Sequence, residues 1–487
     1  MKLKSLALST ALLATLACQK QDDSHSTPSA IDLNKAQQAL PVPTNPYLAN
    51  SPWPMSHQNP YQQGSTPLPG PSSADELSQL THLEAGYVNI TQAISSPYPD
   101  GSRVSWGSNA THIYKTLIQP SVKMISSYEK PEIKGISGAY TLLDKDNQFF
   151  VPVSTTIYRF TDQQIGNAQS DIQLAGSFSI PESLISRDDE HIVGINMTYD
   201  GHVTFATSAG TVGVVSRDFS QQSLVKLPGT AAEEVSNSMS LDETGGIYVV
   251  SNESMYRLQW TGKELTLDPT KGAWVSSYEV GGDIRIPGRL GKGSGSTPSL
   301  MGTGMEDQFV VITDGQVLTH LVLFWRHEIP ADWQPIAPGK SRRIAAEIPV
   351  TFGDSEATQS MSEQSVLVNG YGAVVVNNDY ATTIAPKNEL IAEIWSYLTV
   401  FRSNLPQVAP YGVQKFQWNP TTRTLSSPWA NRTISCPNAI PTMSQATNMM
   451  YCVGQRETIW NIEAIDWNTG ASAFYRPIGI DSHFNSF

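Results

Sequence analysis

The chain reads INMTYDGHVTFA from Ile195 to Ala206 and NSMSLDETGGIYVV from Asn237 to Val250. In both stretches an Asn enters an apolar run, an acidic turn with glycine follows, and a second β-rich run comes after the turn. The pattern recurs along the chain without identical sequence. Divergent repeats of a few strands each are typical of a β-propeller, in which every repeat forms one blade. The sequence therefore predicts an all-β fold.

Further segments of the same kind set the expected number of blades. Their apolar and polar residues alternate between turns, as in strands. They cover residues 98–107, 136–160, 296–324, 363–380 and 438–475. We predict a single closed β-propeller over residues 51–487 with about seven blades, and eight or six as alternatives, because closure removes exposed sheet edges. Phe484–Phe487 look like the opening of another inner strand, which fits a domain truncated at its C-terminus.

The charge balance argues against one class of partner. The chain has 487 residues, of which 15% are charged, and a formal net charge of −13. Nucleic-acid binding needs a basic surface that neutralises phosphates. We therefore expect no nucleic-acid partner.

The first 18 residues are predicted to be a targeting segment. Lys2 and Lys4 precede an apolar run, residues 6–17, that is too short to span a bilayer. The run closes on Thr15-Leu16-Ala17-Cys18, which resembles a bacterial lipobox. This resemblance implies lipid attachment at Cys18, and Gln19 after it implies retention at the outer membrane. The alternative is an ordinary signal peptide cleaved near Ala17.

Residues 19–50 are expected to form a flexible tether, because they are rich in Gln, Ser and Pro. The chain would then be exported and held by its lipid at the periplasmic side of the outer membrane or at the cell surface. The stretch Trp53–Gly64 differs from the tether. Its aromatic and Met residues indicate that it packs onto the domain.

Cys436 and Cys452 are separated by 16 positions, a spacing that suits neighbouring strands of one hairpin. Exported cysteines can pair, and no Cys-x-x-Cys or nearby His pair indicates a metal site. We predict a disulfide between them. Two buried free thiols remain the alternative.

Two fragments resemble quinoprotein-like propellers, the superfamily of pyrroloquinoline-quinone dehydrogenases and outer-membrane assembly propellers. Trp53-Pro54-Met55-Ser56-His57 looks like the opening before their first blade, and Ala464-Ile465-Asp466-Trp467-Asn468-Thr469-Gly470 looks like their blade-closing motif. The family repeats the second motif in most blades, whereas this chain contains it once. We therefore do not expect a bound quinone.

The blade starts resemble a second group, the gluconolactonase, paraoxonase and strictosidine synthase propellers. That group places Asn, Asp and Glu at the blade starts to hold a divalent metal in the central channel. The matching positions are Asn196, Asn237, Glu363, Asn438 and Asn485. Their oxygen atoms suit Ca²⁺, which takes 6–8 such ligands. The alternative for each Asn is an Asx-turn with its own backbone. A buried Glu363 should have a cationic or hydrogen-bonding partner.

Three functions remain open from the sequence. The first is a membrane-held propeller that binds a ligand or partner at the face of its central channel. The second is a calcium-dependent lactonase or esterase, and the third is a quinone-dependent oxidoreductase. His320, Arg326 and His327 could reach a pocket, but the sequence assigns no catalytic residue and no reaction.

Overall fold

The computed structural model describes residues 42–79, 83, 92–132, 140–230, 232–281, 289, 291–302, 307–380 and 405–479. These residues contain thirty strands and three short 3₁₀ helices, η1 (Asp75–Gln79), η2 (Glu182–Leu184) and η3 (Pro269–Lys271). Within this part of the chain, no helix is long and apolar enough to cross a membrane.

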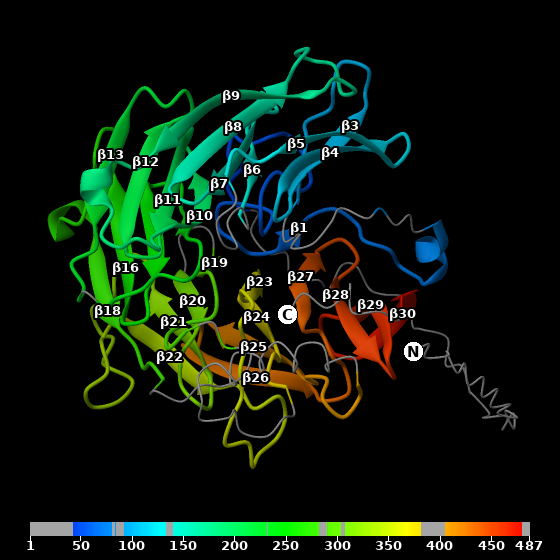
Figure 1. Ribbon diagram of the computed structural model, residues 1–487. Coiled ribbons are helices and arrows are strands. Elements are labelled where there is room, and N and C mark those ends of the chain that lie inside the picture. Colours follow the sequence, from blue (N-terminus) through cyan, green and yellow to red (C-terminus); the bar gives the residue numbers. More distant parts are fainter. Residues whose placement is uncertain are drawn as a thin grey trace, which may run out of the picture.

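The strands form seven sheets, each built on four strands that follow one another in the sequence. Figure 1 shows the sheets arranged around a common centre, near which β10, β19, β23 and β27 lie. This arrangement confirms the predicted all-β propeller with about seven blades.

Blade 1 contains β2 (Gln92–Ile94), β3 (Arg103–Ser108), β4 (His112–Gln119) and β5 (Lys123–Glu129), and blade 2 contains β6 (Leu142–Leu143), β7 (Phe149–Val153), β8 (Thr156–Asp162) and β9 (Ile172–Ser179). Blade 3 contains β10 (Ile192–Met197), β11 (His202–Thr207), β12 (Thr211–Ser216) and β13 (Gln222–Lys226). Blade 4 contains β14 (Ser240–Leu241), β15 (Gly246–Val250), β16 (Ser254–Trp260), β17 (Leu265–Thr266) and β18 (Trp274–Ser277). Blade 5 contains β19 (Ser299–Met301), β20 (Phe309–Thr313), β21 (His320–Trp325) and β22 (Ile344–Pro349). Blade 6 contains β23 (Leu367–Asn369), β24 (Gly372–Val376), β25 (Val413–Asn419) and β26 (Thr424–Asn431). Blade 7 contains β1 (Ser65–Thr66), β27 (Asn438–Ser444), β28 (Met449–Arg456), β29 (Ile459–Asp466) and β30 (Ser472–Gly479).

The hydrophobic core lies between neighbouring blades, and strand β20 shows why. Phe309 and Val311 pack in the cluster shared with blade 6, whereas Val310 and Ile312 pack in the cluster shared with blade 4. Successive side chains of a strand point to opposite faces of its sheet. A strand with an apolar residue at every position can therefore be buried on both faces between two other blades.

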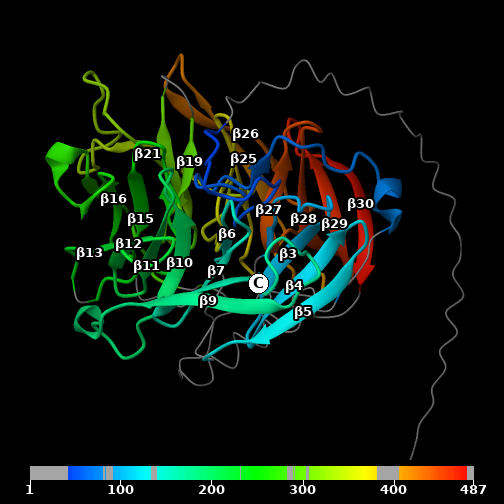
Figure 2. The ribbon, with the colours of Figure 1, turned by 90° about the horizontal axis from the view of Figure 1, so that it is seen from above.

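The ring is closed by an N-terminal strand added to the last blade. β1 pairs in parallel with β27, with Ser65 opposite Met443 and Thr66 opposite Ser444. The remaining strands of that blade come from the C-terminal part of the chain. Blade 7 thus joins the two ends of the fold, and β1 covers the inner edge strand β27. In Figure 2, the blue N-terminal part of the described chain lies beside the orange and red strands of this blade.

Residues 45–66, which we call the plug, cross the end of the channel where the inner strands finish. Met55, Tyr61 and Gln62 of the plug are almost fully buried. Inner strands of six blades donate a backbone N–H to a plug carbonyl: Ile94 to Trp53, Leu143 to Pro54, Leu241 to Pro60, Leu300 to Tyr61, Val368 to Gln63 and Met443 to Gly64. Blade 3 contributes the side chain of Asn196, which donates to Pro60. The plug is therefore bonded to every blade.

The boundary between tether and domain lies earlier than the expected residue 50. Asn45, Leu48 and Ala49 are 7%, 6% and 5% exposed. The amide of Asn45 donates to the carbonyls of Met197 and Thr198, and Ala49 N donates to Leu143. These contacts make residues 45–50 part of the plug, because a free tether would leave such groups in water.

Candidate binding face

Asn196 lies at the plugged end of the channel. It is the penultimate residue of β10, and its Nδ2 donates to the carbonyls of Pro60 at 3.1 Å and Met239 at 2.9 Å. Its Oδ1 accepts from Met197 N at 2.7 Å. The side chain therefore holds the plug and the neighbouring blade together.

Asn237 and Glu363 lie at the opposite end, where the inner strands begin. We call this end the cleft face. Asn237 Nδ2 donates to the Ser294 carbonyl at 3.1 Å. The Glu363 carboxylate packs on Gly295, where an added Cβ would lie 2.6 Å from Glu363 Cδ. Asn237 and Glu363 thus contact adjacent residues of the same segment, whereas Asn196 contacts the plug.

Three of the predicted site residues cannot be placed. Asn438 begins β27, but its side chain is outside what the structure describes. Asn485 and Cys18 fall outside the described residues.

The placed residues do not fit a calcium shell. Ca²⁺ needs several oxygen atoms converging on one point. Asn196 and Glu363 lie at opposite ends of their inner strands, since Asn196 is next to the end of β10 and Glu363 precedes the start of β23. Glu363 Oε1 lies 3.7 Å from Arg289 Nε, and both side chains are nearly buried. Arg289 thus supplies positive charge beside this carboxylate.

The cleft face carries an open, polar cleft between blades 5 and 6. It has a volume of about 420 Å³. We call it the acidic cleft, and its lining is Thr351, Phe352, Asp354, Glu356, Ala357, Thr358, Gln359, Ser360, Asn377, Asp379, Tyr411 and Arg432. Arg432 Nη2 pairs with Asp354 at 2.9 Å. Glu356 and Asp379 leave the cleft with an excess of negative charge.

Asp379 is a partly buried acid of the acidic cleft. Burial raises the pKa of its carboxyl, although hydrogen bonds from Gln359 Nε2 and the charge of Arg289 oppose this shift. A carboxylate removed from water is stabilised by a nearby cation. The sequence did not indicate this cleft, because its walls come from loops that are distant in the chain and have no shared motif.

The histidines singled out in the sequence lie in different places. His320 is in blade 5, with Nδ1 3.2 Å from Asp314 Oδ2. His327 Nε2 lies 3.8 Å from Asp242 Oδ2, and the pKa of His327 is lowered to about 4, chiefly by burial. Arg326 is fully buried, with its guanidinium over the ring of Tyr61. His327 and Arg326 therefore belong to the plugged end.

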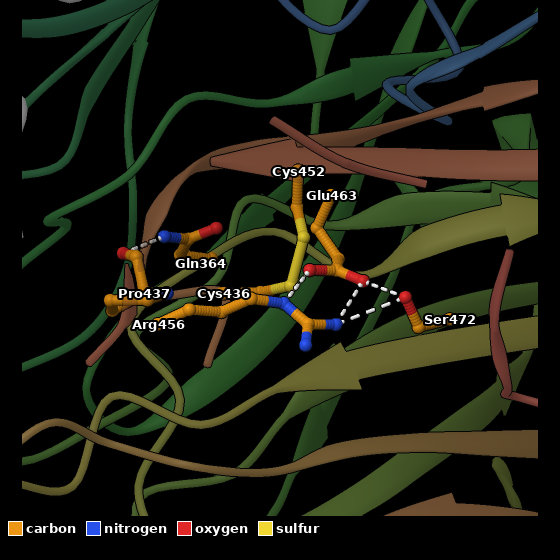
Figure 3. The surroundings of a disulfide bond; sticks show 7 residues. All are labelled: Gln364, Cys436, Pro437, Cys452, Arg456, Glu463 and Ser472. Carbon is orange, nitrogen blue, oxygen red and sulfur yellow. Dashed lines mark hydrogen bonds and ion pairs between the residues drawn. A yellow bond between two sulfur atoms is a disulfide. The ribbon is translucent and has the colours of Figure 1, made fainter. Parts of the chain in front are cut away.

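The predicted disulfide is present. Cys436 and Cys452 are bonded, with 5.7 Å between their Cα atoms. Figure 3 shows the bond beside two groups of side chains. Gln364 donates to the carbonyl of Pro437, and Glu463 accepts from Arg456 and Ser472. The disulfide ties the segment before β27 to β28 within blade 7.

Both fragments that resemble quinoprotein propellers have structural roles here. Trp53–His57 belongs to the plug. In the other fragment, Asp466 Oδ1 accepts from the backbone N–H groups of Asn468 and Thr469 at 3.0 and 2.8 Å. These bonds close the turn between β29 and β30.

Comparison with known proteins shows one close relative in sequence. The chain is 42% identical over 498 residues to an uncharacterised protein of Archaeoglobus fulgidus, an alignment that covers 99% of this chain and 94% of the relative. The chain belongs to the same family as this archaeal protein. No known protein-family profile matches the present chain.

Solved structures show that this family shares its fold with quinoprotein propellers. The quinohemoprotein alcohol dehydrogenase ADHIIG of Pseudomonas putida HK5 has a TM-score of 0.52 at 11% identity, over 88% of this chain and 72% of that chain. BamB of Moraxella catarrhalis has a TM-score of 0.40 at 10% identity, over 69% and 74%. The likeness to ADHIIG confirms the resemblance to quinoprotein-like propellers for the fold alone. The resemblance to the gluconolactonase group stays a prediction.

Proposed function

We propose that this chain is an exported propeller, lipid-anchored at Cys18, that binds a cationic ligand or partner in the acidic cleft. The observation that carries this proposal is the unbalanced charge of the cleft. Three carboxylates, Asp354, Glu356 and Asp379, face one guanidinium, that of Arg432, in a cavity of about 420 Å³. An ammonium or guanidinium group would balance this charge.

The position of the plug supports the cleft face as the binding face. Tyr199, in the turn after β10, donates its hydroxyl to the carbonyl of Pro43 at 3.1 Å. The chain therefore enters the propeller at the plugged end, and a lipid anchor at Cys18 would approach from that side. The acidic cleft would then be turned away from the membrane, towards ligands or partners in solution.

The two enzymatic alternatives have less support. Of the residues expected to bind calcium, Asn196 contacts the plug, whereas Asn237 and Glu363 contact Ser294 and Gly295 at the opposite end of the inner strands. The two quinoprotein-like fragments form the plug and a turn. Shared fold alone does not carry an activity from one propeller to another.

A binding experiment with two cationic probes tests the proposal. Spermidine and a tetralysine peptide would each be titrated into the protein at low ionic strength, and their binding followed by calorimetry. Comparison of the two probes distinguishes a site for a small ligand from a site for a peptide. We expect at least one probe to bind, and Glu356→Gln with Asp379→Asn to weaken that binding about fivefold, as loss of about 1 kcal/mol implies. Glu182→Gln, which removes an exposed acid between blades 2 and 3, serves as the control. Absence of binding by both probes, or equal binding by the double variant, would overturn the proposal.

A further inference from the structure

A second group of chemically active side chains lies in blade 5, outside the acidic cleft. Asp314 follows β20, His320 begins β21 and Glu347 lies in β22, so three adjacent strands bring them together. One ligand atom from each lies within 4.8 Å of the others. Asp314 is buried, and His320 and Glu347 are partly exposed. The group is therefore reachable from solvent on one side.

The donor atoms define the kind of cation that fits. His320 Nδ1 lies 3.2 Å from Asp314 Oδ2, and the Gln316 side-chain amide contacts both, at 3.0 Å from the ring nitrogen and 2.7 Å from the carboxylate. Rotation of this amide would turn its oxygen towards the same point. One imidazole and two carboxylates, with the Gln316 amide oxygen available as a fourth donor, suit a borderline divalent ion such as Zn²⁺ better than Ca²⁺, which prefers oxygen ligands only.

A lysine ammonium already neutralises one of these ligands. Lys340 Nζ lies 2.8 Å from one oxygen of Glu347 and 2.9 Å from the other, and 3.0 Å from Glu279 Oε1. Glu279 is more than half exposed, with 54% of its side chain accessible. Lys340 can therefore leave Glu347 while it keeps a partner in Glu279. The ammonium acts as a competitor that a divalent ion must displace.

We propose that Asp314, His320 and Glu347 form a binding site for a borderline divalent metal ion of the Zn²⁺ class, with Lys340 as the built-in competitor. This site is independent of the proposed binding of cations in the acidic cleft, because the two share no residue. Its selectivity for a transition-metal ion over an organic cation comes from the imidazole nitrogen.

Titration of the metal-free protein with Zn²⁺ tests the proposal. We expect one equivalent to bind, and Ca²⁺ not to compete at the same concentration. His320→Ala should lower the affinity for Zn²⁺ at least tenfold, because mutation even of the hydrogen-bonding partners of metal ligands typically costs about tenfold or more. His191→Ala, which removes an exposed histidine, should leave it unchanged. Co²⁺ should give ligand-field absorption bands that disappear in His320→Ala.

A variant that binds Zn²⁺ more tightly distinguishes a change at the metal site from a loss of the fold. Lys340→Met removes the competing ammonium and should raise the affinity for Zn²⁺, with the fold checked by circular dichroism. Zinc binding that is unchanged in both His320→Ala and Lys340→Met would overturn the proposal, as would a Zn²⁺ affinity no greater than that for Ca²⁺. Binding of spermidine or tetralysine should be the same in these variants, so the outcome is separate from that for the acidic cleft.

Discussion

The guanidinium of Arg326 lies over the ring of Tyr61, with 5.0 Å between its Cζ and the ring centroid. Both side chains are fully buried, and the Tyr61 hydroxyl donates to Glu243 at 2.5 Å. Tyr61 belongs to the plug, whereas Arg326 follows β21 of blade 5. The contact therefore fixes the N-terminal segment to the propeller by packing, by charge and by a hydrogen bond.

Truncation of Tyr61 should destabilise the whole propeller. Tyr61→Ala removes a buried aromatic side chain from the junction of the plug with blades 4 and 5, and such changes cost about 3–5 kcal/mol. Denaturant unfolding followed by circular dichroism would measure the loss. Tyr475→Ala, at a site 46% exposed, should cost less than about 1 kcal/mol. Similar effects of the two substitutions would show that the plug is not a structural element.

Removal of one member of the buried Arg289–Glu363 pair should be more harmful than removal of both. Glu363→Gln leaves the Arg289 guanidinium in a desolvated site, although Arg289 keeps its contacts with the Gln316 carbonyl at 3.2 Å. Breaking a buried pair costs about 3–5 kcal/mol, whereas replacing both charges is often close to neutral. Thermal melting of Glu363→Gln, Arg289→Met and the double variant would measure the coupling. Additive losses would contradict a paired role.

The sequence revealed the blades because the signal for each one is local. Alternation in segments such as Phe309–Thr313, and turns such as Asp466–Gly470, depend on residues close together in the chain. The prediction that the residues at the blade starts face one another assumed that all of them lie at the same level along the channel axis. Asn196 resembles Asn237 in sequence but lies next to the end of its strand, at the plug. The acidic cleft and the Asp314–His320–Glu347 group depend on contacts between distant segments, which one sequence does not show.

The Cys436–Cys452 disulfide should stabilise blade 7. A loop of this length, 16 positions, corresponds to about 3 kcal/mol in the chain-entropy account of cross-links. We expect Cys436→Ala with Cys452→Ala to lower the free energy of unfolding by about that amount. Alkylation of the unreduced, denatured protein followed by mass spectrometry should modify neither cysteine in the parent chain. Full modification of both would contradict the bond.

Lipid attachment at Cys18 should determine where the protein fractionates. The parent chain should be recovered with membranes and carry the mass of a diacylglyceryl group on Cys18. Cys18→Ala should be found in the soluble fraction of the exported material, because a single lipid anchor would be lost. Ala17→Ser, which keeps a small residue before the cysteine, is the control. An unchanged distribution and mass in Cys18→Ala would favour an ordinary cleaved signal peptide.

The buried His57 of the plug should make the fold sensitive to acid. Its side chain packs against Tyr140, with ring centroids 5.5 Å apart, and burial lowers its pKa to about 3. The unfolded chain takes up a proton on His57 near its ordinary pKa of about 6.5, whereas the folded chain keeps the ring neutral. The free energy of unfolding should therefore fall as the pH decreases from about 6.5 towards 3, by up to about 1.4 kcal/mol per pH unit.

His57→Gln removes this proton uptake, so the stability difference between the variant and the parent should shift in favour of the variant below pH 6.5. Other groups titrate equally in both chains and cancel in the difference, and His191→Gln should show no such shift. A difference between His57→Gln and the parent that stays constant from pH 7.5 to 4.5 would show that His57 takes up its proton while the plug remains in place.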